Sequence, residues 1–222
     1  MQMFLDRVEA GKRLAAALKA TVGKGAIVLA IPRGGVVVGH IVARALGIPL
    51  DIIIPRKIGA PSNPELAIGA MTEDGTTILD ERLIQQLDIS RHYIKEESEK
   101  QKLEIERRLK LYRGQAPYPD LKNREVVIVD DGIATGSTMK AALSSVRRRG
   151  AKKIIIAVPV GPESTIKELK DEADSVVCLF TPEPFYAIGQ FYTKFDQTSD
   201  DDVKRLLKAS TEKSREKQDS VS

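Results

Sequence analysis

Short, uninterrupted runs of apolar residues alternate along the chain with longer segments in which apolar positions recur every three or four residues. The short runs, rich in Val and Ile, are typical of strands buried on both faces of a parallel sheet. The longer segments are typical of amphipathic helices that cover such a sheet, so the pattern predicts an α/β fold. The predicted strands are residues 26–31, 50–55, 126–129, 153–160 and 175–180, and the predicted helices are residues 3–20, 36–46, 81–86, 90–112, 137–149, 164–172 and 201–208.

The middle of the chain departs from this alternation. Residues 58–65 are rich in Gly, Pro, Ser and Asn, which predicts a loop without regular structure. The apolar stretches 66–71 and 76–79 flank an acidic turn and predict a β-hairpin. Residues 90–112 carry many i,i+4 charge pairs and a thin apolar seam, which predicts a long exposed helix. Such a helix either docks on a partner or lid, or lies solvated across its own domain, and the sequence leaves both open.

The run at residues 126–129 leads into the most distinctive stretch of the chain. Asp130 and Asp131 stand where this strand ends, and a loop of small, hydroxyl-rich residues follows before the next helix. Open α/β sheets bind ligands at such strand ends, and the backbone N–H groups there favour a phosphate. The carboxylates would repel a phosphate unless they face neutral hydroxyls or a cation. The spacing fits neither a Walker A loop nor a dinucleotide fingerprint, and an ordinary turn capped by Asp is the alternative.

Neutral hydroxyls flanked by phosphates describe a ribose phosphate, and this stretch resembles the phosphoribosyl-pyrophosphate (PRPP) motif of the type I phosphoribosyltransferases. The resemblance covers about residues 1–209 in element order. It implies a Rossmann-like sheet, a flexible β-hairpin lid and a small C-terminal hood. It also implies Mg²⁺, which would arrive with PRPP and be held by ligand oxygens and water rather than directly by the protein. The ribose hydroxyls would be bound by Asp130 and Asp131, and the 5-phosphate by Ala134, Thr135, Gly136, Ser137 and Thr138.

Two further strand ends carry glycines and basic residues that suit a pyrophosphate. Paired glycines allow the backbone to approach a ligand closely, and a guanidinium matches the geometry of a phosphate. The alternatives are helix–strand packing for the glycines and a solvated charge pair for the basic residues. The resemblance implies that Arg33, Gly34, Gly35, Arg56 and Lys57 bind pyrophosphate and that Arg33, Lys57 and Asp131 are the catalytic residues.

Four of the ten aromatic residues of the chain follow the last predicted strand, within residues 181–192. Aromatic rings beyond a strand end suit stacking on a planar base, but they also suit a loop packed on the sheet. The resemblance places a base-binding hood in this region. Phe185 and Tyr186 are therefore the candidates for binding the base, with packing as the open alternative.

The composition fits a single globular domain. With 222 residues and 42% hydrophobic content, we expect one domain over residues 1–209, including a helical insertion at 80–113. Residues 210–222 are polar and charged and are predicted to be a disordered tail. The sequence shows no apolar run of transmembrane length and no signal-peptide core, so we expect a cytoplasmic protein without a membrane partner. One cysteine and two histidines make a dedicated zinc site improbable.

The charge balance adds little to this picture. A net charge of +4 is modest for a protein that binds nucleic acid, and a ligand with several phosphates needs positive charge in any case. We therefore expect PRPP and a small-molecule acceptor as partners, a homodimer, and no nucleic acid. The predicted function is transfer of phosphoribosyl from PRPP to a nitrogen acceptor, expected to be a nucleobase. A non-catalytic PRPP-binding regulator and an allosteric subunit of a nucleotide pathway are the alternatives, since folds host many functions.

Overall fold

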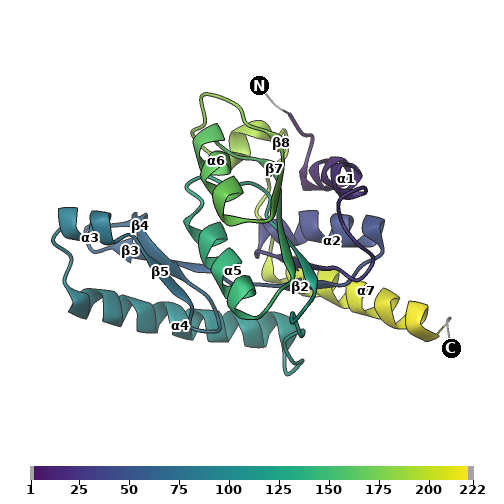
Figure 1. Ribbon diagram of the computed structural model, residues 1–222, viewed down its shortest axis with the longest axis horizontal. Helices are drawn as coiled ribbons and strands as arrows, with labels where there is room; N and C mark the ends of the chain where they lie inside the picture. The colour runs from purple at the N-terminus through teal and green to yellow at the C-terminus, as the bar shows by residue number, and fades with distance from the viewer. Residues whose placement is uncertain (1–2, 220–222) are drawn as a thin grey trace.

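The computed structural model describes residues 3–219, and its centre is a five-stranded, all-parallel sheet (Figure 1). The strand order is β2-β1-β6-β7-β8. All five predicted strands of the sheet are confirmed, although the second is shorter than expected and ends at Ile52, opposite the last residue of β1, Ala30. The strands are β1 (Ile27–Ala30), β2 (Leu50–Ile52), β6 (Glu125–Val129), β7 (Lys153–Val160) and β8 (Ser175–Phe180).

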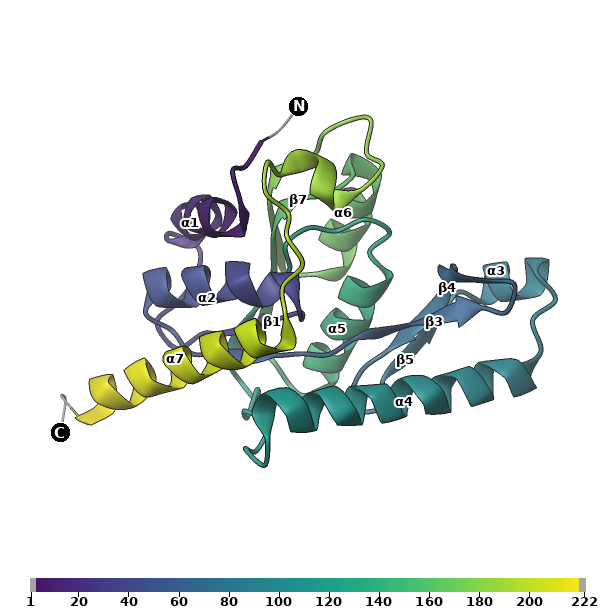
Figure 2. The ribbon, with the colours of Figure 1, turned by 180° about the vertical axis from the view of Figure 1, so that it is seen from behind.

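Helices cover both faces of the sheet, and the sheet separates the core into two apolar clusters (Figures 1 and 2). Successive side chains of a strand point to opposite faces. In β1, Val28 and Ala30 therefore pack into one apolar cluster, while Ile27 and Leu29 pack into the other. The first cluster lies under α1 (Arg7–Leu18), α2 (Gly34–Leu46) and α7 (Asp200–Asp219), and the second under α5 (Ser137–Arg148) and α6 (Glu163–Glu172).

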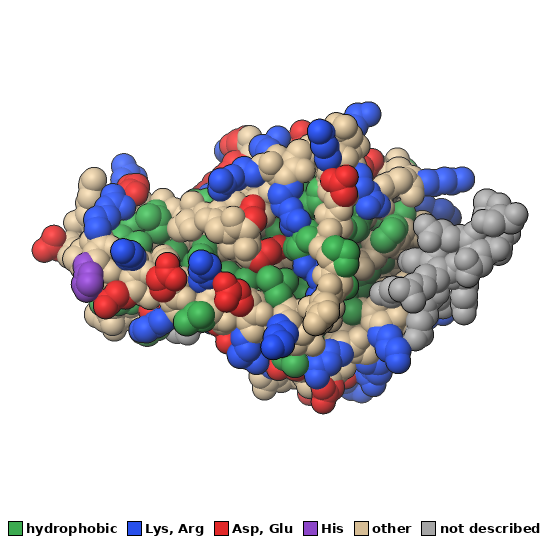
Figure 3. Space-filling view, turned by 90° about the horizontal axis from the view of Figure 1, so that it is seen from below, with side chains coloured by type: hydrophobic (Ala, Val, Ile, Leu, Met, Phe, Trp, Pro, Cys, Tyr) green, Lys and Arg blue, Asp and Glu red, His purple; other side chains and the backbone are tan. Residues whose placement is uncertain are grey.

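A second, smaller sheet and two helices project from the main body as an arm (Figure 1). The antiparallel sheet has the order β3-β4-β5, and the arm also contains the predicted helices of the 80–113 insertion. In the space-filling view of Figure 3, acidic and basic side chains are interspersed along the arm. The arm consists of β3 (Arg56–Ala60), β4 (Asn63–Met71), β5 (Thr77–Leu79), α3 (Glu81–Gln86) and α4 (Arg91–Arg113).

The predicted β-hairpin is confirmed as β4 and β5, but the prediction of an irregular loop at residues 58–65 is wrong. Most of that segment belongs to β3 and β4, and only Pro61 and Ser62 turn between them. The reason is tertiary: Ile58 and Ile68 bury their side chains in an apolar cluster with residues of α3 and α4. Burial of this face offsets the poor strand propensity of the Gly and Pro residues. The pairing register shifts at Gly59, as expected for an irregular strand.

The C-terminal region returns to the main body. A short 3₁₀ helix, η1 (Ile188–Phe191), packs its Phe191 with Phe4 and Tyr192 in a small aromatic cluster. The final helix α7 extends to Asp219 and includes residues 210–219 of the predicted tail. That segment contains neither Gly nor Pro and is rich in strong helix formers. Residues 220–222 of the predicted tail lie outside the described residues. Within residues 3–219, no helix is both long and apolar enough to cross a membrane.

Candidate functional site

The two glycine-containing loops of the sequence meet at one edge of the central sheet. Strands β1 and β6 are parallel neighbours with Ala30 opposite Val129, so the loops that follow them start side by side. A Cβ atom at Gly34 would lie 1.9 Å from Asp131 Oδ2, and one at Gly35 would lie 2.8 Å from Asp130 Oδ1. Only glycine permits this approach. The structure therefore brings together the predicted pyrophosphate loop and the predicted ribose-binding acids.

The two carboxylates of the acidic pair have different surroundings. The Asp131 carboxylate accepts a hydrogen bond from Arg7 Nε at 2.7 Å, and the two side chains are each 12% exposed. Asp130 Oδ1 instead accepts a hydrogen bond from the Asp131 backbone N–H at 2.8 Å. Burial, and then the charge of Asp131, raise the pKa of the Asp130 carboxyl well above its ordinary value. Asp131 thus has a cationic partner, whereas Asp130 is protonated more easily than an ordinary Asp side chain.

Sequence reasoning missed the groups that hold Asp131. Arg7, near the start of α1, also stacks over the Phe195 ring at 3.8 Å and donates to the Asp196 carbonyl. The Tyr192 hydroxyl donates to the Asp131 carbonyl at 2.6 Å. The helical spacing of α1 gives no signal of a partner 124 positions away. These contacts fix the orientation of Asp131 from both ends of the chain.

The predicted 5-phosphate loop forms a cradle at the start of α5. Gly136 has a φ of 79°, a conformation that favours glycine, and it precedes the first helical residue, Ser137. The Ala134 carbonyl accepts a hydrogen bond from Thr165, which holds the loop from α6. Thr135 and Ser137 lie within 3.3 Å of each other through their hydroxyl oxygens. Backbone N–H groups at such a helix start, together with Thr138 in its first turn, suit a phosphate.

A pocket of about 400 Å³ lies beside this loop. Thr135, Ser137 and Lys140 line it from the side of α5, and Glu168 lines it from α6. The Lys140 ammonium lies 2.7 Å from the Glu168 carboxylate. The opposite wall comes from the arm, through Ala67, Gly69, Ala70, Ile78, Leu79 and Asp80. The arm therefore covers the predicted 5-phosphate loop on this side.

The predicted basic residues occupy two different settings. Arg33 precedes α2 and lies 3.7 Å from the Asp200 carboxylate at the start of α7. Arg56 and Lys57 were expected on a loop at the end of the second strand, but they are the first residues of β3, in the second sheet. Arg56 Nε donates to the Gln101 side chain of α4 at 2.8 Å. Burial, and then the charge of Arg108, lower the pKa of Arg56. Arg56 is thus a half-buried strand residue that faces α4.

The two aromatic candidates do not come together at the acidic pair. Phe185 packs on Phe191 with a ring-centroid distance of 4.9 Å, as in the packing alternative. Tyr186 is 83% exposed. Tyr192 of the same region contacts Asp131, and Ile188 approaches the loop after β6, since a Cβ atom at Gly132 would lie 2.6 Å from its Cγ2. Ile188 carries no chemical signal in the sequence, so pattern analysis had no means of selecting it.

Comparisons with known proteins show the family of the chain. Residues 3–195 match the family model described as the phosphoribosyl transferase domain. The crystal structure of TT1426 from Thermus thermophilus is 41% identical, with a TM-score of 0.80 over 93% of this chain and 98% of that one. Rv0571c of Mycobacterium tuberculosis, named as a candidate phosphoribosyl transferase, is 44% identical over 207 residues, which are 93% of this chain and 47% of that protein. The chain spans about half the length of this curated relative.

Proposed function

The chain belongs to the phosphoribosyl transferase domain family, and on that premise we propose that it transfers the 5-phosphoribosyl group of PRPP to a nitrogen acceptor, expected to be a nucleobase. The bond between ribose C1 and the pyrophosphate oxygen breaks, a bond from the acceptor nitrogen to C1 forms, and the nitrogen loses a proton. Pyrophosphate leaves with most of the charge. The main demand on the protein is therefore electrostatic stabilisation of an anion beside a cationic ribose.

The observation that carries this proposal is the close contact of Gly34 with Asp131 and of Gly35 with Asp130. Pyrophosphate and the ribose hydroxyls are neighbours on PRPP, so a protein that binds both needs a phosphate loop in direct contact with hydroxyl acceptors. Carboxylates accept hydrogen bonds from hydroxyls, and the lack of a side chain at the two glycines lets the loop backbone, with its N–H donors, lie directly against the acids. An ordinary turn would not require glycine at both positions facing the acids.

The remaining residues act on the charged ends of the substrate. Arg33, Arg56 and Lys57 would stabilise the departing pyrophosphate by their positive charge. The loop from Ala134 to Thr138 would hold the 5-phosphate, which is remote from the reacting C1 atom. Binding energy from a remote group is used to hold the reacting centre in position.

Magnesium fits the donor set of the site as a companion of the substrate. Asp130 and Asp131 stand at the strand end as adjacent carboxylates, and no group of three or more His, Cys, Asp or Glu side chains within the described residues is arranged to hold a metal ion. Oxygen ligands from PRPP and water would complete such a site, with the two carboxylates as partners. Bound Mg²⁺ would supply positive charge to the pyrophosphate oxygens.

The arm would act as a lid over the bound substrate. Strands β4 and β5 and the 5-phosphate loop line the same pocket, which supports this role. Closure of a lid excludes water from the reacting centre, and water would otherwise trap the ribose cation.

The proposal is tested with PRPP, Mg²⁺ and a panel of nucleobases and small amines, with release of pyrophosphate as the measurement. We expect release that depends on one acceptor or a small group of related acceptors. Tight binding of PRPP without turnover for any acceptor would favour a PRPP-binding regulator instead. Absence of both binding and turnover would contradict the proposal.

A further inference from the structure

One side of the long helix α4 carries polar groups that face β3 and the start of α7 and have no role in the proposed reaction. Gln101, Glu104, Arg108 and Tyr112 follow one another at intervals of three or four residues, which places them along one side of the helix. Gln101 binds Arg56 of β3, and the Tyr112 hydroxyl donates to the Asp200 carboxylate of α7 at 2.5 Å. This side of α4 therefore contacts Arg56, a predicted pyrophosphate residue, and Asp200, which lies beside another, Arg33.

Four arginines from three elements gather here, and we call Arg33, Arg56, Arg107 and Arg108 the arginine cluster. Glu104 binds Arg107 and Arg108, each through an Nε–carboxylate contact of 2.7 Å. Hydrogen bonds from Arg107 and Arg108 lower the pKa of Glu104 to about 2. The guanidinium charges of the cluster outnumber the carboxylates beside them. Glu97, the other nearby carboxylate of α4, does not change this balance, because it also pairs with Lys100.

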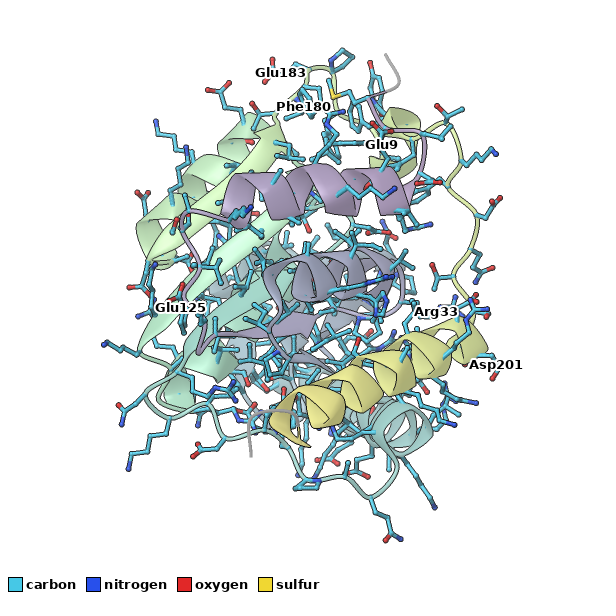
Figure 4. All side chains as sticks on the ribbon, turned by 90° about the vertical axis from the view of Figure 1, so that its right-hand side faces the viewer. Glu9, Arg33, Glu125, Phe180, Glu183 and Asp201 are labelled. Carbon is cyan, nitrogen blue, oxygen red and sulfur yellow. The ribbon has the colours of Figure 1, made fainter. Side chains whose placement is uncertain are left out.

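Asp200 supplies the remaining negative charge, and its position is that of a bound anion. Its carboxylate lies 3.7 Å from Arg33 Nη1 and accepts the Tyr112 hydrogen bond. That hydrogen bond, followed by the charges of Arg33, Arg107 and Arg108, lowers the pKa of Asp200. Figure 4 shows Arg33 beside the first turn of α7, where the neighbouring Asp201 is labelled. An anion that enters to bind Arg33 meets the donors that now hold Asp200.

We propose that Arg108 and Tyr112 of α4 extend the pyrophosphate site, and that the Asp200 carboxylate fills this extension until an oligophosphate replaces it. This inference rests on the proposed function and assigns a binding role to the helical insertion. A phosphate group offers more acceptor oxygens and more charge than a carboxylate, so it competes well for guanidinium and hydroxyl donors. Entry of pyrophosphate then releases the start of α7 from Arg33.

The test is calorimetric titration of the full chain with inorganic pyrophosphate and Mg²⁺ at constant ionic strength. Arg108→Gln is expected to raise Kd about tenfold, which corresponds to the loss of one charge-assisted hydrogen bond. Asp200→Asn is expected to lower Kd several-fold, because it removes the competing charge. Arg91→Gln is the matched control, since Arg91 lies at the far end of the same helix and its side chain is 67% exposed. It should leave Kd unchanged.

The direction of the Asp200→Asn effect distinguishes the inference from misfolding of the variant, because a misfolded protein does not gain affinity for pyrophosphate. Equal Kd values for Arg108→Gln and Arg91→Gln, weaker binding by Asp200→Asn, or no binding of pyrophosphate by the unaltered chain would each overturn the inference. The proposed function is judged separately by PRPP turnover. If PRPP is turned over but the Kd for pyrophosphate does not depend on Arg108, the proposed function stands and the extension of the site is refuted. If pyrophosphate binding depends on Arg108 but PRPP is neither bound nor turned over, the extension stands and the proposed function is refuted.

Discussion

The Arg7 guanidinium donates to the Asp131 carboxylate at 2.7 Å and joins the first helix of the chain to the acid predicted to bind the ribose. Both side chains are largely buried, so solvent screens this ion pair less than it would an exposed one. The pair links the N-terminal helix to the candidate site. It also places a cation where the two adjacent carboxylates would otherwise repel each other.

Arg7→Gln is expected to lower the free energy of unfolding by about 1–3 kcal/mol, because a largely buried carboxylate loses its charged partner. Urea unfolding measures this change. Lys12→Gln removes one positive charge from an exposed position of the same helix and should have little effect. In a double-mutant cycle with Asp131→Asn, the two changes should be non-additive. Additive effects would show that the pair contributes nothing of its own.

Asp131→Asn is expected to abolish stabilisation by PRPP. At a concentration of about 100 times Kd, a ligand adds about 2.7 kcal/mol to the native state. Thermal unfolding with and without PRPP and Mg²⁺ measures the effect as a shift in Tm. Glu125→Gln is the control, because Glu125 begins the same strand at its opposite end. A full PRPP-dependent shift in Asp131→Asn would refute the ribose-binding role.

Gly34→Ala should impair both folding and PRPP binding, because its Cβ atom would meet Asp131 Oδ2 at 1.9 Å. Displacement of that carboxylate would break the ion pair with Arg7. Overpacking of this kind lowers the free energy of unfolding by about 1–3 kcal/mol. Gly25→Ala offers a matched control, since nothing lies within 4 Å of its Cβ position. Urea unfolding and PRPP titration of both variants provide the measurement. Equal behaviour of the two would mean that Gly34 is not in contact with the acids.

The pH dependence of stability should report on Asp130. Burial and Asp131 raise its pKa in the folded state above the ordinary 3.8. A carboxyl with a raised pKa contributes stability that is present below its unfolded pKa and is lost as pH rises through the folded pKa. Asp130→Asn avoids this loss. In urea unfolding from pH 3.8 upward, the variant should become steadily more stable relative to the unaltered chain, whereas the exposed Asp171→Asn should not. A pH-independent difference would contradict this assignment.

The extent of successful prediction follows from the range of the interactions involved. The inner strands β1, β6 and β7 were predictable because apolar residues fill them almost without interruption, and burial of both faces imposes that pattern directly. The helix at residues 81–86 was predictable because its spacing is local. The parts of β3 and β4 within residues 58–65 were not, because the Gly and Pro residues there oppose a strand, and packing against α3 and α4 stabilises it.

The sequence by itself determined the order of the central strands and of the helices that cover them, and the two loops that carry candidate site residues, since both depend on residues close together in the chain. Tertiary structure alone decided that Gly34 touches Asp131, that Arg7 neutralises it, and that Asp200 lies against Arg33. These contacts join residues far apart in the chain, and no periodicity encodes such a pairing. They form because neighbouring parallel strands end at one edge of the sheet, where the helices from both ends of the chain also pack.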